Sequence, residues 1–127
     1  NVPECEALIG FAPVTEAQIR DAARKFGDLG AKHVLFKGGH GSGATVCDLL
    51  VDCESAAIVM LEAPRLETRH THGTGCTLAS AIASGLAQER PLVEAVMKAH
   101  AYVHEAIRTA PGLGAGHGPL NHFVKPD

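Results

Sequence analysis

One stretch constrains the fold of this chain more than any other part of it. Residues 69–77 are crowded with histidine and threonine and contain Gly73 and Gly75, and glycine permits backbone angles that other residues resist. Residues 78–87 are small or apolar, and their larger side chains recur at the i, i+4 and i+8 positions of one helical face, namely Leu78, Ile82 and Leu86. The pattern predicts an irregular glycine-rich loop that runs directly into a buried helix.

The join between this loop and the predicted helix suits an anion. The first backbone N–H groups of a helix have no helical partners and lie at the positive end of its dipole. The candidate donors for the charge of a phosphate are the backbone groups of Gly73, Thr74, Gly75 and Cys76. The same dipoles would favour the thiolate of Cys76. The alternative is an ordinary helix start, in which the glycines only allow close packing.

Composition limits the classes of protein to which the chain can belong. Its 127 residues are 46% hydrophobic and 20% charged, which is typical of a globular domain. The net charge of −3 gives no reason to expect nucleic acid as a partner, and no apolar run is long enough for a membrane. The four cysteines form no C-x-x-C pair, which favours reduced thiols and a cytoplasmic protein over a disulfide framework.

Helical patterns occupy much of the chain. Residues 3–9 and 92–109 are predicted helices, and Thr15 opens a capping box for another helix that should end near Leu29. We expect the solvated face of that helix to carry three basic residues, Arg20, Arg24 and Lys25. In the glycine- and histidine-rich tail, the expected docking residues are Phe123 and Val124.

Strand patterns lie between these helices. A short apolar run at residues 33–37 predicts a buried parallel strand, and residues 45–51 and 57–61 predict a hairpin. Ligands of open α/β sheets collect outside strand ends, so Lys37 is a candidate phosphate contact. The alternative is that Lys37 is a solvated lysine beside a loop. Asp48 interrupts an apolar strand, and we favour a turn or edge position for it over contact with substrate or metal.

Four segments together resemble one family of kinases. The stretch from Thr71 to Leu78 resembles the signature of the hydroxymethylpyrimidine phosphate kinases of thiamine biosynthesis, which are members of the ribokinase-like superfamily. Three further segments match in the family's order, at residues 1–8, at residues 37–40, and at residues 114–119 with His122. The resemblance covers the C-terminal half of such a kinase. It implies a single partial domain over residues 1–127, the C-terminal half of a three-layer α/β/α ribokinase-like fold, with the N-terminal half absent.

The resemblance also implies an activity. The reaction would be ATP-dependent phosphorylation of 4-amino-5-hydroxymethyl-2-methylpyrimidine and its monophosphate, with Mg²⁺ held through the ATP phosphates. Cys76 stands where the wider superfamily has an aspartate, so it would meet the substrate hydroxyl and accept its proton. The implied nucleotide contacts are Lys37, Gly38, Gly39, His72 and His100. Some members of the family have a lysine at the position of His100, whereas here Lys98 lies two residues away on another helix face.

Other interpretations use the same residues. A pyridoxal kinase-like enzyme is one, and a non-catalytic half-domain that binds nucleotide or phosphate is another. Half a sheet exposes an edge and an apolar face, so we expect a homo-oligomer or a complementing N-terminal half as partner. An enzyme with Cys76 as nucleophile would need a histidine within hydrogen-bond reach. Zinc on His70, His72 and Cys76 would need a fourth ligand, and we expect no protein-held metal site.

Overall fold

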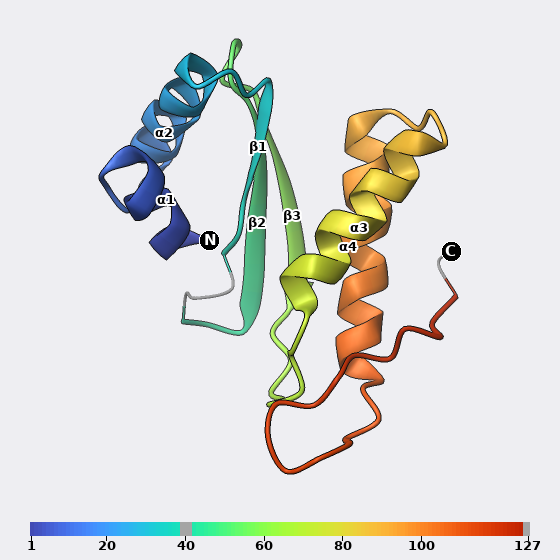
Figure 1. Ribbon diagram of the computed structural model, residues 1–127. Coiled ribbons are helices and arrows are strands. Elements are labelled where there is room, and N and C mark those ends of the chain that lie inside the picture. The colour runs from blue at the N-terminus through green and yellow to red at the C-terminus, as the bar shows by residue number, and fades with distance from the viewer. Residues whose placement is uncertain (39–41, 126–127) are drawn as a thin grey trace. The chain divides into compact units, whose positions relative to one another are not determined.

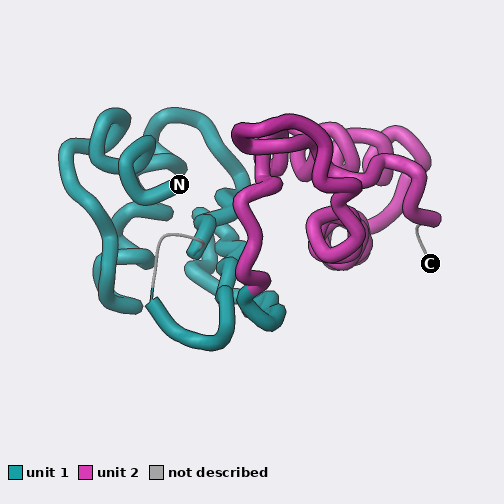
Figure 2. Tube along the Cα trace, turned by 90° about the horizontal axis from the view of Figure 1, so that it is seen from below, with its two compact units in different colours: residues 1–65 teal, residues 66–127 magenta. Residues whose placement is uncertain are grey.

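The computed structural model describes residues 1–38 and 42–125. It contains two compact units, Asn1–Arg65 and Leu66–Asp127, which Figure 2 shows in different colours. The single partial domain over residues 1–127 stays a prediction. The described residues of the first unit form two helices and three strands, α1 (Val2–Ile9), α2 (Glu16–Asp28), β1 (His33–Phe36), β2 (Thr45–Asp52) and β3 (Ile58–Pro64). The second unit holds α3 (Thr74–Ala87) and α4 (Leu92–Arg108).

The three strands form one sheet in the order β1-β2-β3. The predicted hairpin is confirmed, because β2 and β3 pair antiparallel from Thr45 opposite Pro64 to Val51 opposite Ile58. The predicted parallel strand at residues 33–37 is wrong, since β1 also pairs antiparallel with β2. The chain returns from β1 to β2 through a short connection, whereas parallel neighbours need a crossover of about a dozen residues or more.

The helices of the first unit begin at the predicted residue for α2 and one residue earlier than predicted for α1. Asn1 caps α1 and Thr15 caps α2, each in a capping box closed by the side chain three residues on. α2 ends at Asp28, close to the predicted end. The two helices cover one face of the sheet (Figure 1). The core between them consists of Cys5, Ile19, Ala22, Ala23, Phe36, Val51 and Cys53.

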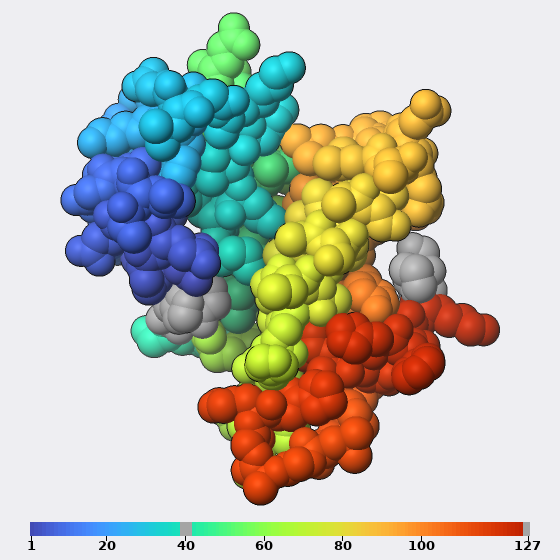
Figure 3. All heavy atoms as spheres, viewed as in Figure 1, coloured from blue at the N-terminus to red at the C-terminus, as the bar shows by residue number. Residues whose placement is uncertain are grey.

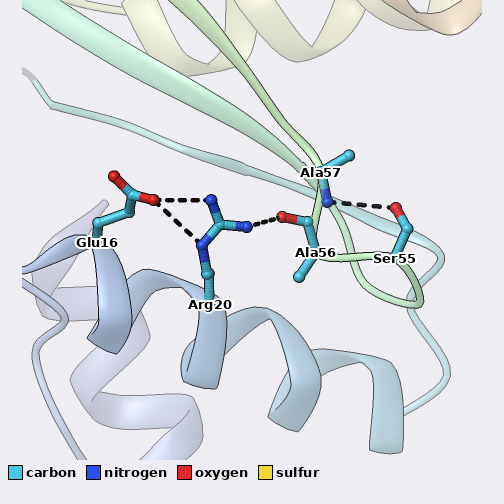
Figure 4. A network of polar contacts seen from close by, with 5 residues as sticks. All are labelled: Glu16, Arg20, Ser55, Ala56 and Ala57. Carbon is cyan, nitrogen blue, oxygen red and sulfur yellow. Dashed lines mark hydrogen bonds and ion pairs between the residues drawn. The ribbon is translucent and has the colours of Figure 1, made fainter.

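Arg20 was predicted to lie on a solvated face of α2, but its side chain also binds the turn between β2 and β3. Its guanidinium donates to the carbonyl oxygen of Ala56 in the β2–β3 turn, and Glu16 accepts hydrogen bonds of 2.7 and 3.2 Å from it (Figure 4). Ala56 has a φ of 59°, a left-handed conformation that is uncommon for alanine. Arg20 therefore ties α2 to a strained turn. Arg24 is 63% exposed, as predicted.

α3 and α4 lie side by side in the second unit (Figure 1). A Cβ on Gly85 would lie 2.9 Å from the Cβ of Ala95, so the missing side chain allows the two helices to approach closely. The prediction of a buried α3 is wrong for most of the helix, because Leu78 is buried but Leu86 is 44% exposed. The face of α3 that packs on α4 contains Gly85 rather than Leu86. The side chain of Leu86 therefore points away from α4.

The last part of the chain packs against α4 only in part through the residues that the sequence predicts. Leu120 is buried, and the backbone N–H of Asn121 donates to the carbonyl oxygen of Ala106 at 3.0 Å. Docking by Phe123 is a wrong prediction, since this side chain is 96% exposed, whereas Val124 is half-buried and lines a groove together with residues of α4. None of the described helices is long and apolar enough to cross a membrane.

Candidate functional site

The glycine-rich loop meets the N-terminus of α3, as the sequence predicts. Gly73 is the N-cap residue with a φ of 82°, and no side chain caps the helix. A left-handed φ is readily adopted by glycine. The N–H and the hydroxyl of Thr74 donate to the carbonyl oxygen of Thr71 at 3.3 and 2.7 Å, which closes a tight turn. Thr74 and Gly75 already belong to α3, so the irregular segment ends earlier than predicted.

Two backbone donors remain at this helix end. Within the described part of the chain, the N–H groups of Gly75 and Cys76 donate no hydrogen bond. They lie in the first turn of α3, where the helix dipole is positive. The thiol of Cys76 is exposed at the same place. The two unpaired N–H groups can bind an anionic oxygen, and the thiol beside them can contact a second reactant.

The C-terminal segment packs against the loop that precedes α3 (Figure 3). The N–H of Gly118 donates to Nδ1 of His70 at 3.1 Å, and Nδ1 of His117 lies 2.8 Å from a backbone carbonyl oxygen of the loop. His72 forms an isolated parallel bridge with Pro119. Two of the segments on which the family resemblance depends are therefore neighbours in space.

A groove of about 430 Å³ runs along α3 from Cys76. It is lined by Cys76, Thr77, Ser80, Ala81, Tyr102 and His122. The hydroxyl of Tyr102 donates to the carbonyl oxygen of His122 at 3.1 Å, which joins α4 to the tail at the groove wall. A second groove of about 330 Å³ shares Tyr102 and His122 and adds the cationic side chains of Lys98 and Arg90. The two grooves therefore adjoin.

His100 stands where some members of the family have a phosphate-binding lysine, and the structure shows how His100 and Lys98 lie on α4. His100 is half-buried on α4 and lines neither of these two grooves. Lys98 lines the second groove and lies 3.8 Å from Glu94, one helical turn earlier. Lys98 and Tyr102 share a face of α4 because they are four residues apart. The contact predicted for His100 stays a prediction, and the lysine in the groove is Lys98.

Lys37 and Gly38 belong to the first unit, directly after β1. Lys37 forms an ion pair with Asp48, and Gly38 donates its N–H to Oδ1 of Asp48 at 2.8 Å. Asp48 is fully buried in the central strand, so it is neither a turn nor an edge residue as we predicted. Lys37 is not simply a solvated lysine, because its side chain is 29% exposed and paired. Gly39 lies outside the described residues.

Sequence reasoning missed both the Lys37–Asp48 pair and the groove wall at Tyr102. A carboxylate inside an apolar strand, preceded by a lysine at a strand end, is the signal that could have found the pair.

The hypothesis that Cys76 is a nucleophile lacks a base, because no hydrogen bond joins the Cys76 thiol to a histidine in the described ranges. In residues 1–38 and 42–125, no cluster of three or more His, Cys, Asp or Glu side chains could hold a metal ion.

Known proteins are similar in sequence to this chain. A family model described as phosphomethylpyrimidine kinase matches residues 1–121. The thiamine biosynthesis bifunctional protein ThiED of Geobacter sulfurreducens is 48% identical over 124 residues, which cover 98% of this chain and 25% of that protein. A hydroxymethylpyrimidine/phosphomethylpyrimidine kinase of Staphylococcus aureus is 42% identical over 126 residues, which cover 98% of this chain and 45% of the relative.

A solved structure shares the fold. The pyridoxal kinase of Staphylococcus aureus, in complex with AMP-PCP and pyridoxal, matches with a TM-score of 0.85 and 31% identity, over 96% of this chain and 46% of that one. This likeness confirms the predicted α/β, ribokinase-like fold class. The chain spans less than half the length of each of these proteins. Its motifs, its fold and its identity with these relatives agree, and the chain belongs to the phosphomethylpyrimidine kinase family.

Proposed function

We propose that the protein containing this chain transfers the γ-phosphoryl group of ATP to hydroxymethylpyrimidine and to its monophosphate in thiamine biosynthesis. The observation that carries the proposal is the N-terminus of α3, where the unpaired N–H groups of Gly75 and Cys76 adjoin an exposed thiol at a groove. Phosphoryl transfer depends on positioning and charge neutralisation more than on covalent chemistry. This helix end supplies both.

The residues of the loop would have separate roles. The N–H groups of Gly75 and Cys76, with the turn formed by Gly73 and Thr74, would bind the oxygens of the transferred phosphoryl group. The thiolate of Cys76 would hold the substrate hydroxyl and accept its proton as the oxygen attacks phosphorus. The bond to the departing ADP breaks in the same transfer.

For the nucleotide, we propose the contacts that the family resemblance implies. Lys37 carries a positive charge for the phosphates, and we keep Gly38, Gly39, His72 and His100 as further proposed contacts. AMP-PCP is an ATP analogue, so its binding by a 31% identical kinase supports ATP as the donor. Mg²⁺ would supply charge neutralisation between phosphates. This metal would be held mainly through ATP, since Mg²⁺ usually binds substrate phosphates and takes few protein ligands.

A pyridoxal kinase is the second candidate. It is favoured by the likeness to the Staphylococcus aureus pyridoxal kinase, whose TM-score is 0.85. Both enzymes would phosphorylate a hydroxymethyl group on a planar heterocycle, so the same thiol and helix terminus would serve either substrate. A non-catalytic domain that binds nucleotide or phosphate is the third candidate.

We also propose how the protein is assembled and where it acts. Met97, Leu113 and Phe123 are exposed apolar side chains, and they support either a homo-oligomer or binding of a complementing N-terminal half. All four cysteines are free, which supports the cytoplasm as the compartment.

The test uses the product of the complete gene. The protein is incubated with ATP and MgCl₂ and with hydroxymethylpyrimidine, its monophosphate or pyridoxal, and products are identified by mass spectrometry. Cys76→Ala should lower kcat about 100-fold with unchanged thermal stability, because proton transfer is lost. Ala79→Ser, on the same helix but outside the groove lining, is the matched control. Phosphorylation of pyridoxal alone would establish the second candidate, and nucleotide binding without transfer would establish the third.

A further inference from the structure

We propose that Asp48 is a positioning residue that holds the ammonium group of Lys37 in place for the phosphates of a nucleotide. The inference rests on the proposed function, because it takes a nucleotide as the ligand beyond β1. Asp48 is fully buried, whereas the side chain of Lys37 is 29% exposed. The ion pair therefore has a fixed anion inside the protein and a cation that reaches solvent.

The register of the sheet places the two residues opposite each other. β1 and β2 pair with Phe36 opposite Leu49, so the next residue on each side is Lys37 and Asp48. Directly opposed side chains on antiparallel strands have Cβ atoms about 5 Å apart and share a face of the sheet. Because side chains alternate along a strand, this face is the one turned away from Phe36 and the helices α1 and α2.

Both oxygens of the carboxylate are used. One oxygen pairs with Nζ of Lys37, and the other accepts the backbone N–H of Gly38 at 2.8 Å. A Cβ on Gly38 would lie 1.9 Å from the carbonyl oxygen of Cys47, so the chain passes β2 at a distance that only glycine permits. Asp48 thereby sets the direction of the ammonium and of the backbone at the same point.

The energetics favour a fixed cation over a mobile one. A buried carboxylate without a partner is strongly unfavourable, so Lys37 remains paired in the absence of a ligand. An ammonium has three N–H donors, and the pair leaves others for a ligand. A phosphate that binds there meets an ordered charge, so less side-chain entropy is lost on binding than at a free surface lysine.

The test separates positioning from folding. In the complete gene product, affinity for Mg·ADP is measured by calorimetry, and acetylation of Lys37 by acetic anhydride is followed by mass spectrometry with and without ADP. Asp48→Asn should weaken ADP binding about tenfold and speed the acetylation of Lys37, because the ammonium loses its charged partner. Lys37→Met should weaken binding similarly, and the double variant no further, because Asp48 acts through Lys37.

The control lies in the same strand. Asp52→Asn removes a carboxylate of β2 that contacts no lysine in the described chain, and it should leave ADP affinity unchanged. Should Asp48→Asn not fold, Asp48→Glu keeps the charge, displaces the carboxylate and should still weaken ADP binding.

The outcomes distinguish the inference from the proposed function. Unchanged ADP affinity in Asp48→Asn, or an equal further loss in the Lys37→Met background, would overturn the inference. So would ADP binding that leaves Lys37 unprotected from acetylation, even in an active kinase. Protection of Lys37 that depends on Asp48, in a protein that phosphorylates none of the substrates, would support the inference and refute the kinase. A protein that binds no ADP would refute both.

Discussion

The backbone N–H of Gly118 donates a hydrogen bond of 3.1 Å to Nδ1 of His70, and this contact joins the C-terminal segment to the loop before α3. A Cβ on residue 118 would lie 2.4 Å from that nitrogen and 2.7 Å from the carbonyl oxygen of Leu113. The two segments approach this closely because position 118 has no side chain. The loop that leads into α3 is thus held in place by the C-terminal segment.

Gly118→Ala should therefore destabilise the protein. The added methyl group displaces His70 and weakens its hydrogen bond, and overpacking of this kind lowers the free energy of unfolding by about 2 kcal/mol. The measurement is denaturant unfolding. Gly116→Ala is the matched control, because a Cβ there meets nothing within 4 Å and should change stability by less than about 0.5 kcal/mol. Equal effects of the two substitutions would contradict the packing that we describe.

Arg20→Ala should destabilise the first unit. It removes the guanidinium that holds the carbonyl oxygen of Ala56 in a turn with a φ of 59°. The side chain is 37% exposed, so we expect a loss of about 1 kcal/mol in the free energy of unfolding, at the lower end for a charged hydrogen bond. Arg24→Ala, on the same helix, removes an exposed ion pair with Asp21 and should have almost no effect. A larger loss from Arg24→Ala would refute this assignment.

Asp52 should make stability depend on pH in the acid range. Its Oδ1 accepts the backbone N–H of Ser55 at 2.7 Å and of Glu54 at 2.9 Å. The hydrogen bonds of Ser55, then that of Glu54 and the nearby His33, hold the pKa of the Asp52 carboxyl below its ordinary value of 3.8. A lowered pKa contributes stability that is complete above the unfolded value and is lost as the pH falls through the folded value.

The check is a comparison of the wild-type protein with Asp52→Asn across a pH series. The difference in unfolding free energy should be constant near neutral pH and should shrink below pH 3.8. A difference that persists unchanged far below that pH would show that the carboxylate charge contributes nothing there.

The cysteines should differ in their rates of alkylation. Cys76 is exposed, whereas Cys5 and Cys53 are buried, and burial raises the pKa of both buried thiols. Because the thiolate is the reactive form, iodoacetamide should label Cys76 first in the native protein and the buried pair only after unfolding. Peptide mapping by mass spectrometry gives the order, with denatured protein as the control. Modification of Cys53 before Cys76 would contradict the structure.

Local signals predicted much of the secondary structure. The capping box at Thr15, the hairpin of β2 and β3, and the junction of the glycine-rich loop with α3 follow from contacts within a few residues, as does the capping box at Asn1, which was not predicted. Such contacts form in any chain with those residues, because the side chain and the backbone group that it binds are close in sequence. The candidate site at the N-terminus of α3 was recognisable for that reason, although the roles of its residues stay predictions.

The packing of distant segments could not be predicted in the same way. The rotation of α3 about its axis decides which of its residues contact α4. In the structure Gly85 packs closely against α4, and the larger side chain of Leu86 is left exposed. The pairing direction of β1 likewise depended on its neighbour rather than on its own apolar run. Apolar patterns show that a face is buried but do not identify the partner.

The sequence by itself determined the family, the order of helices and strands, and the glycine-rich start of α3. Only the tertiary structure decided that Lys37 pairs with Asp48 and that His70 holds Gly118. The physical reason is that register and close packing join residues far apart in the chain. A shift of one residue in the sheet would turn Asp48 to the opposite face, and no local pattern states which register wins.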